Sequence, residues 1–259
     1  MSMKLSVVLI TFNEEDRLEE TLKSCLFIAD EIVVVDSFST DNTVAIAEKF
    51  KAKILKHRFL DFGTQKNIAL NLASFPWVLN LDADERVSEQ LQQEILKLKQ
   101  LPDNEIDVDG FLIKRKSKYL GRWITHSGWY PDRKLRLFKK EKSAWSGRIH
   151  ERLHLDGTTK KLDGDILHFT YRHITDHITR LNKYSQLQSQ DIVAKGKKCL
   201  YLRVLLLPSI TFIRFYIWKL GFLDGLPGFV IALISSWSTA MKYLKAIEIK
   251  REQKAPIQE

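Results

Sequence analysis

The sequence predicts an α/β domain built on a mainly parallel sheet, followed by an apolar and basic extension. Over the first hundred residues, strand-like runs of β-branched residues alternate with segments of helical periodicity. The connections between them are short, which favours parallel strands joined by right-handed crossovers. The hydrophobic fraction of 44% is enough for a sizeable core. Neither a glycine-rich dinucleotide fingerprint nor a P-loop is present, so NAD and Walker-type sites are not expected.

Four strands are expected in order, and each precedes a helix. Their sequences are KLSVVLITF (4–12), EIVVVD (31–36), AKILKH (52–57) and WVLNLD (77–82). The helices after the second, third and fourth strands are expected to begin at Asp41, Thr64 and Ser88. These short polar side chains can cap backbone N–H groups. In such sheets, ligands bind beyond the carboxyl ends of the strands. The polar residues that follow each strand are therefore the candidate site.

The fourth strand ends in Asp82-Ala83-Asp84. Side chains two positions apart share a face, so both carboxylates are expected to point past the sheet edge. Hard oxygen ligands of this kind suit Mn²⁺ or Mg²⁺, which bind through one or two carboxylates plus substrate phosphates. Asp84 and Asp82 are therefore candidate metal ligands. The alternative is a solvated turn in which the dipole of the next helix favours Asp84 and Glu85.

Four stretches carry a family resemblance: SVVLITFNEE, VVVDSFSTDNT, GTQKNIALNLA and LNLDADE. In order and spacing they resemble the nucleotide-sugar domain of family 2 inverting glycosyltransferases, over about residues 4 to 100. The stretches GWYPDRKLRLFKK, WSGRIHERL and GFLDGLPGF are similar to bacterial lipopolysaccharide-core β-glucosyltransferases. The resemblance implies a Rossmann-like GT-A domain with a mixed sheet and a metal-binding DXD motif. It also implies transfer of a hexose, with glucose expected, from a UDP-sugar to a saccharide acceptor of the lipopolysaccharide core.

The resemblance also implies roles for residues at the donor site. Those expected to line the nucleobase and ribose pocket are Thr11, Phe12 and Glu14. Asp36 would accept a hydrogen bond from the uracil imide, which an anionic carboxylate does well. Asp82 would lie near the ribose while Asp84 contacts the metal.

Lys66 is implied to lie near the diphosphate as a point charge, although family members often carry Arg-Asn where this chain has Lys66-Asn67. A solvated lysine on a helix face is the alternative. The stretch YPDRKLRLFKK alternates as a strand, and Arg136 on it could reach the sugar diphosphate or an acceptor phosphate, since arginine binds such groups bidentately. A solvated basic strand face would give the same pattern.

Inverting transfer needs a base on the face opposite the departing nucleotide, to take a proton from the acceptor hydroxyl. A metal-bound carboxylate is a poor candidate for that role. In SGRIHERLHL, the resemblance implies that His150-Glu151 replaces the Glu-Asp pair of other family members. Glu151 is the expected base, with His150 and Asp132 as alternatives. The structural alternative is an ion pair of Glu151 with Arg148 or Arg152.

The C-terminal extension holds most of the net charge of +9, because eleven Lys or Arg against four acids from Lys195 onward give +7. It also carries the apolar runs VLLLPSITFIRFYIW and GLPGFVIALISSW, which charges, prolines and glycines interrupt. Its longest uncharged stretch, residues 225–241, is at the lower end of the length that spans a membrane. We expect an in-plane or re-entrant amphipathic hairpin on an anionic membrane surface, or else a packing or oligomer surface. Nucleic acid is not an expected partner, since zinc-finger spacing and RNP-like strands are lacking.

The expected domains are a catalytic domain over 1–195, with a nucleotide-sugar half (1–100) and an acceptor half (101–195), and a helical extension over 196–259. An acidic helix start follows the first apolar run where a signal-peptide cleavage site would lie. The expected location is therefore cytoplasmic, peripheral on the inner face of the cytoplasmic membrane. Two alternatives keep the sheet: transfer to polyprenyl phosphate, and a catalytically silent membrane-attached protein that binds sugar or nucleotide. A glycoside hydrolase also needs paired carboxylates, but not this sheet edge.

Overall fold

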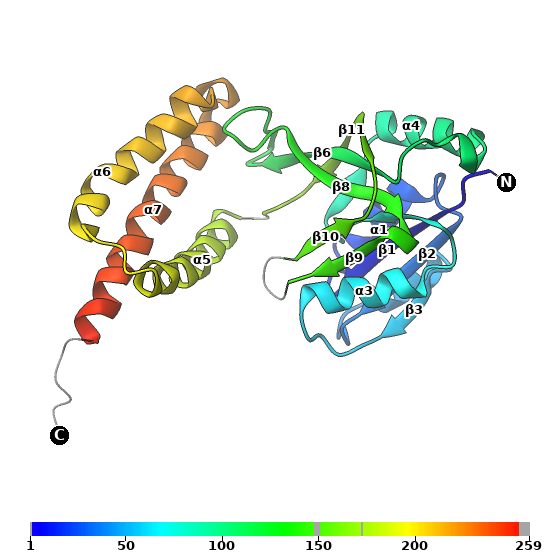
Figure 1. The fold of residues 1–259 in the computed structure, drawn as a ribbon, viewed down its shortest axis with the longest axis horizontal. Coiled ribbons are helices and arrows are strands. Elements are labelled where there is room, and N and C mark those ends of the chain that lie inside the picture. The colour runs from blue at the N-terminus through cyan, green and yellow to red at the C-terminus, as the bar shows by residue number, and fades with distance from the viewer. Residues whose placement is uncertain (1, 148–150, 172, 254–259) are drawn as a thin grey trace. The chain divides into compact units, whose positions relative to one another are not determined.

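The computed structural model describes residues 2–147, 151–171 and 173–253. The chain forms two compact units, which are coloured along the sequence in Figure 1. The first comprises Met1–Lys116 and Asp132–His168, and the second comprises Ser117–Pro131 and Phe169–Glu259. The predicted catalytic domain ended at residue 195, whereas the helix before that point, α5 (Ile174–Ala194), belongs to the second compact unit.

A mixed sheet organises the first unit, in the order β3-β2-β1-β4-β8-β6-β11-β5. Strand β7 pairs with Lys118 and Tyr119 at the end of β6, and all of these residues belong to the second unit. The strands are β1 (Leu5–Thr11), β2 (Glu31–Asp36), β3 (Lys53–Lys56), β4 (Trp77–Asn80), β5 (Glu85–Val87), β6 (Gly110–Tyr119), β7 (Arg122–Trp123), β8 (Asp132–Lys139) and β11 (Thr159–His168). Strands β1 to β4 are parallel, while β8 is antiparallel to both β4 and β6. A separate antiparallel ribbon joins β9 (Ser143–Ser146) to β10 (Arg152–Leu155). The predicted mixed α/β sheet is confirmed.

Alternating side chains divide the core into two layers. In β1, Leu5, Val7 and Leu9 belong to one buried cluster, and Val8 belongs to the other. Helices α1 (Leu18–Cys25), α2 (Thr43–Lys49) and α4 (Glu89–Gln100) contribute to the first cluster. Helix α3 (Phe62–Leu72) and the β9–β10 ribbon cover the opposite face (Figure 1). Both faces are buried, as the apolar strand sequences predicted.

The helix starts differ in part from the predicted ones. Ser88 caps α4 as expected and accepts a hydrogen bond from the Leu91 N–H. Thr64 does not cap α3, because the helix begins two residues earlier and Asp61 accepts the Thr64 N–H instead. Asp41 lies one residue before the N-cap of α2 and accepts the Thr43 N–H. In α3, Asp61 therefore takes the capping role that was predicted for Thr64, and aspartate is at least as good a capping residue as threonine.

The strand order creates a switch point beside β1. Strand β1 pairs with β2 on one side and with β4 on the other, so the chain crosses over β1 between β3 and β4. At such a point the connections leave the two carboxyl ends in opposite directions, and ligands of open α/β sheets bind there. This switch point lies beyond Thr11 of β1 and Asn80 of β4.

The second unit is a helical hairpin with α5 packed on it. Helix α6 (Leu200–Ile213) continues as a π-helical segment, η3 (Arg214–Trp218), and turns through η4 (Gly221–Asp224) into α7 (Leu226–Glu252). Helices α6 and α7 lie side by side in Figure 1, and α5 packs on α7. Pro208 was expected to break the helix, but it lies inside α6, and its carbonyl accepts the Ser236 hydroxyl of α7. Pro227 stands in the first turn of α7, where its missing N–H costs nothing.

By length and composition, one helix in the described part of the chain could cross a membrane: Leu200–Trp218, with a mean hydropathy of 1.5 and 6% of its residues buried. It is a different segment from the uncharged stretch of residues 225–241 singled out in the sequence. Continuation of the helix through Pro208 and Arg214 explains the difference.

Two buried polar side chains of the second unit, Asp224 and His177, bond to the segment Ser117–Pro131 of the same unit. Asp224 is fully buried and accepts hydrogen bonds from the N–H groups of Thr125 and His126 and from the Ser127 hydroxyl. His177 is also buried, and its Nδ1 lies 2.8 Å from the Tyr119 hydroxyl. Burial, with a smaller contribution from Arg180, lowers the pKa of His177 to about 4. This histidine is therefore neutral at pH 7.

Candidate active site

The Asp82-Ala83-Asp84 turn follows β4 at the switch point of the sheet. The Asp82 carboxylate lies between two cations: Oδ1 is 3.2 Å from Lys66 Nζ, and Oδ2 accepts a 2.9 Å hydrogen bond from Arg136 Nη2. Burial alone would raise the pKa of Asp82, but Arg136 and Lys66 outweigh it and hold that pKa well below its usual range. Asp82 is therefore an anion whose charge the protein itself already balances.

Arg136 and Glu85 support this turn from inside the protein. Glu85 is fully buried; its Oε2 accepts the Asp82 N–H at 3.0 Å and its Oε1 accepts Arg136 Nη2 at 2.6 Å. Burial raises the pKa of Glu85; Arg136 opposes the rise, and the nearby Asp82 charge adds to it. Arg136 also donates to the Asn80 side chain, and its buried Nε has no partner among the described residues. Arg136 was predicted to bind the diphosphate, and that role stays a prediction.

Asp84 lies beside two residues that the sequence analysis did not single out. Its Oδ2 accepts a 3.2 Å hydrogen bond from Arg17 Nη1 and lies 3.4 Å from His168 Nε2. Arg17 stands before α1, and His168 ends β11, where it pairs in register with Glu85. Only antiparallel pairing of distant strands brings His168 here, so no local sequence signal could have identified it.

The donor atoms around Asp84 fit a divalent cation that substrate phosphates complete. Within the described residues, no group of three or more His, Cys, Asp or Glu is arranged to hold a metal. A carboxylate and an imidazole nitrogen are nevertheless present within 3.4 Å of each other. Mg²⁺ and Mn²⁺ commonly use few protein ligands when phosphates supply the rest. Asp84 fits that chemistry better than Asp82, because Asp84 has one cationic partner in the described part of the chain, Arg17, whereas Lys66 and Arg136 both offset the charge of Asp82.

Lys66 contacts both the acidic turn, at Asp82, and the candidate base Glu151. It is buried on α3, and its Nζ lies 3.1 Å from Glu151 Oε1 as well as 3.2 Å from Asp82 Oδ1. The same nitrogen lies 4.6 Å from the centre of the Trp145 ring. Asn67 fixes that tryptophan, because its side chain bonds both the N–H and the carbonyl of Trp145 at 2.9 Å.

The candidate bases are in different situations. Glu151 contacts Lys66, whereas the sequence suggested Arg148 or Arg152 as its partner. The alternative base Asp132 forms ion pairs with Arg115 at 2.8 Å and Lys134 at 3.1 Å. His150 and Arg148 lie outside the described residues. Of the two described candidates, Glu151 is the one beside Asp82 and its turn.

The expected nucleobase residues lie past the carboxyl ends of β1 and β2. Asp36 is buried, and its carboxylate accepts hydrogen bonds from the Thr11 hydroxyl at 3.0 Å and from the N–H and hydroxyl of Ser39. Phe12 is 58% exposed. Glu14 is half-buried in the turn before α1, and its N–H donates to Thr43 Oγ1.

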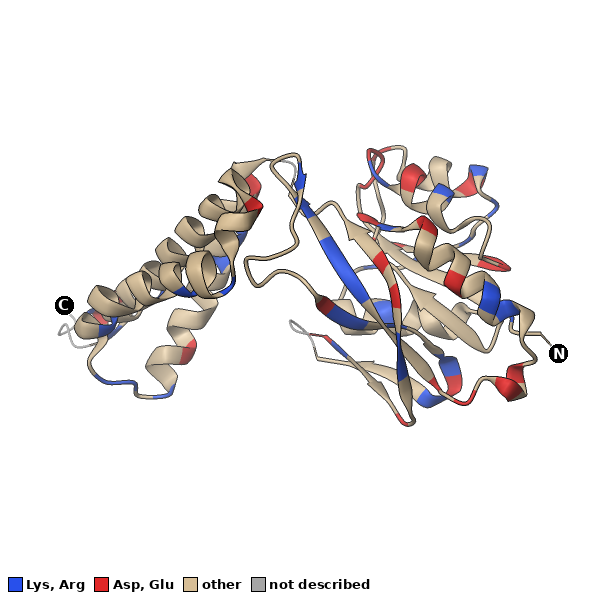
Figure 2. Cartoon of the chain, turned by 90° about the horizontal axis from the view of Figure 1, so that it is seen from above, with Lys and Arg blue, Asp and Glu red and all other residues tan. Residues whose placement is uncertain are grey.

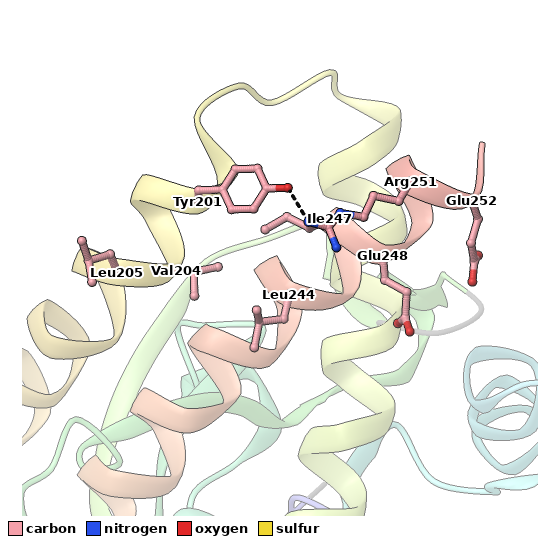
Figure 3. A pocket seen from close by; sticks show the side chains of 8 residues that line it. All are labelled: Tyr201, Val204, Leu205, Leu244, Ile247, Glu248, Arg251 and Glu252. Carbon is pink, nitrogen blue, oxygen red and sulfur yellow. Dashed lines mark hydrogen bonds between the residues drawn. The ribbon is translucent and has the colours of Figure 1, made fainter. Parts of the chain in front are cut away.

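An open groove of about 720 Å³ lies on the second unit. Its lining comes from α6 and α7: Tyr201, Val204, Leu205, Leu244, Ile247, Glu248, Arg251 and Glu252 (Figure 3). The Tyr201 hydroxyl accepts a 3.0 Å hydrogen bond from Arg251 at its rim. None of the predicted site residues lines this groove, so the candidate active site remains at the edge of the sheet.

Comparisons with known proteins assign the chain to a family. The family model "Glycosyl transferase family 2" matches residues 6–152, so the chain belongs to that family and is a glycosyltransferase with a GT-A-type mixed sheet. It is 30% identical over 249 residues to the lipopolysaccharide core biosynthesis glycosyltransferase LpsC of Rhizobium meliloti, covering 90% of this chain and 91% of the relative. It is 29% identical to an uncharacterized glycosyltransferase of Rickettsia typhi, covering 95% and 87%. The structure of S. aureus TarS 1–349 with UDP-GlcNAc matches with a TM-score of 0.48 and 17% identity, covering 99% and 93%.

Proposed function

We propose that this glycosyltransferase moves a hexose from a UDP-sugar to a saccharide acceptor of the lipopolysaccharide core, with inversion at the anomeric carbon. We expect the hexose to be glucose. The observation that carries the proposal is the position of Lys66 between Asp82 and Glu151. One cation thereby links the acidic turn, where a diphosphate would bind, to a carboxylate that can take a proton. Group transfer between two substrates requires both a cation for the diphosphate and a nearby base, whereas a protein that only binds a nucleotide-sugar does not need the base.

The proposed chemistry is a direct displacement. The acceptor hydroxyl forms a bond to the anomeric carbon as the bond from that carbon to the diphosphate oxygen breaks, and UDP leaves with the electron pair. Glu151 receives the hydroxyl proton, which raises the nucleophilicity of the oxygen as the bond forms. Lys66 provides positive charge for the diphosphate and leaves Glu151 free as it does so.

A divalent cation would be held by Asp84 and His168, and it would neutralise charge on the departing diphosphate. Asp82, anchored by Arg136 and Lys66, would orient the donor from the same turn. Thr11, Phe12, Glu14 and Asp36 would receive the uridine. These assignments are proposals that rest on the family resemblance and on the placement of these residues at the switch point of the sheet.

Support for a lipid-anchored acceptor comes from the relative named for lipopolysaccharide core biosynthesis and from the second unit. The hairpin exposes large apolar side chains: Tyr201, Leu202, Leu205, Leu206, Ile210, Ile213, Ile217, Trp218, Leu220, Phe222, Leu223, Leu226, Phe229, Leu233, Trp237 and Leu244. Charged positions are sparse along the middle of α6 and α7 (Figure 2). Basic residues flank that middle, with Lys197, Lys198 and Arg203 at one end of α6.

We propose that this hairpin holds the enzyme on the inner, anionic face of the cytoplasmic membrane. Cations at headgroup level and apolar side chains at the acyl boundary are the features of an interfacial helix. Arg214, four residues from the end of the apolar segment Leu200–Trp218, favours an in-plane or re-entrant position over a spanning one, because a charge within the hydrocarbon core is costly.

The first test is a screen of nucleotide-sugars for Mn²⁺-dependent thermal stabilisation, followed by transfer assays with the best donor. UDP-glucose should raise the melting temperature only when the metal is present. Stabilisation without any turnover would favour a silent binding protein. Turnover on polyprenyl phosphate that survives Glu151→Gln would favour the other alternative, because that acceptor is already an anion. No stabilisation by any nucleotide-sugar would contradict the proposal.

A further inference from the structure

The loops that follow β1 and β2 are tied together into one rim. Ser39 Oγ accepts the Asn13 N–H at 2.9 Å, and Asn13 Oδ1 accepts the Thr40 N–H at 2.9 Å. Glu15 Oε2 accepts the Asn42 N–H at 3.0 Å. Two loops that would move separately as free connections are therefore held in fixed positions beside the buried Asp36.

Phe38 stands in the middle of this rim in an unusual conformation. Its φ is +61°, in the left-handed region that a side chain with a Cβ rarely adopts. Its side chain is 56% exposed, so burial of the ring does not compensate for that backbone. Strained residues of this kind cluster at ligand sites, where the surrounding structure holds them in place. The hydrogen bonds of the rim provide that support.

The place of Phe38 relates it to Asp36 and Phe12. Thr11 and Asp36 are the last register pair of β1 and β2, and the two phenylalanines follow them by one and two residues. Two exposed aromatic rings thus come from adjacent loops at the edge where the buried carboxylate lies. A flat heterocycle with a polar edge needs this combination: a ring face for stacking and an acceptor for its N–H.

We propose that Phe38 is a nucleobase-binding residue, whose ring stacks on the pyrimidine that Asp36 recognises by hydrogen bonding. This rests on the proposed function, since it assigns a residue to the donor site of the same reaction. The strained backbone holds the ring in position before the nucleotide arrives, so binding does not have to order the loop. Stacking would contribute affinity, and Asp36 would contribute the choice of base.

The test is calorimetry of UMP, UDP and inorganic pyrophosphate, each with Mn²⁺, on the full chain and on Phe38→Asn. Asparagine adopts the left-handed conformation readily, so this variant should be at least as stable as the parent while lacking the ring. Its affinity for UMP and UDP should fall by the same factor, about 5- to 150-fold, as for loss of one aromatic stacking partner. Its affinity for pyrophosphate, which has no base, should not change.

Two further variants make the result decisive. Phe38→Tyr keeps a ring and should bind UDP within twofold of the parent. Phe27→Ala removes a 79% exposed phenylalanine just before β2, at the opposite edge of the sheet, and should change nothing. Normal UDP binding by Phe38→Asn, or an equal loss for pyrophosphate, would overturn the inference and leave the proposed function standing. A parent chain that binds no uridine nucleotide would overturn both.

Discussion

Lys66 Nζ lies 3.1 Å from Glu151 Oε1, so the candidate base forms an ion pair with the cation proposed to meet the donor diphosphate. In this arrangement Lys66 engages the Glu151 carboxylate while it also contacts Asp82. We expect the donor diphosphate, as a further anion, to compete for Lys66 and to release Glu151. Donor binding and availability of the base would then be linked.

Glu151→Gln should lower kcat by about 10²- to 10⁴-fold, the usual effect of removing a positioned base, because the amide cannot accept the hydroxyl proton. The KM for the donor should change little. Steady-state kinetics with saturating UDP-sugar measure both values. Glu141→Gln, at an exposed glutamate in the turn after β8, is the control. More than about a tenth of normal turnover in Glu151→Gln would transfer the role to His150 or Asp132.

Asp84→Asn should abolish the Mn²⁺ dependence of UDP binding while leaving the fold intact, since Asp84 lies in the turn after β4. His168→Gln should weaken Mn²⁺ binding less, because the carboxylate remains. Titrations of UDP with and without EDTA compare the variants with the parent. If the parent chain bound UDP equally well in EDTA, the assignment of the metal to Asp84 would be wrong.

Arg136→Met should destabilise the first unit by about 3–5 kcal/mol, because it leaves the buried Glu85 and the adjacent Asp82 without their shared guanidinium. Urea unfolding at pH 7 measures the loss. Arg133→Met, at a half-buried arginine of the same strand whose Nη1 donates to the Leu162 carbonyl, is the matched control. Equal losses in the two variants would show that Arg136 has no special structural role.

Acid should destabilise the second unit through His177. The unfolded pKa is about 6.5 and the folded pKa about 4, so the unfolded state binds the proton first. Stability is therefore lost as pH falls from 6.5 to 4, by up to about 3 kcal/mol. His177→Phe should be less stable at pH 7, since Tyr119 loses its partner, but should lack this acid-dependent loss. Unfolding free energies that fall equally with pH in both proteins would refute the prediction.

Substitution of exposed apolar residues on the hairpin should weaken binding to anionic liposomes. Leu205→Glu and Leu226→Glu each replace an exposed leucine side chain with a carboxylate, so the fold should survive. Sedimentation with phosphatidylglycerol vesicles should decrease in both variants, and UDP binding should not change. Leu101→Glu, at an exposed leucine of the first unit, is the control. Parent protein that ignores such vesicles even at low salt would contradict membrane docking.

The fold was largely predictable because both faces of the sheet are buried, which makes each strand a continuous apolar run. Ser88 was identified as a cap because a single short polar side chain preceded that helix. Thr64 was wrong because Asp61, three residues earlier, offered a competing acceptor. The continuation of α6 through Pro208 was missed because a partner helix, not the local sequence, supports it.

The candidate site was predictable only where its residues follow parallel strands. The acidic turn and Asp36 could be read from the sequence for that reason. His168 and Arg17 could not, because their approach to Asp84 depends on β11 and on the turn before α1. The buried pair of Arg136 and Glu85 was also invisible, since a strand pattern shows which face a side chain occupies but not which charge it meets.

The insertion of β8 between β4 and β6 has a consequence for synthesis of the chain on the ribosome. Strand β4 is complete at Asn80, but its second neighbour begins only at Asp132. At about 5–20 residues per second, the apolar edge of β4 waits several seconds for its partner. An unpaired edge that exposes Trp77, Val78 and Leu79 is a template for association with other chains. Nascent chains stalled between these two strands should therefore aggregate unless a chaperone covers that edge.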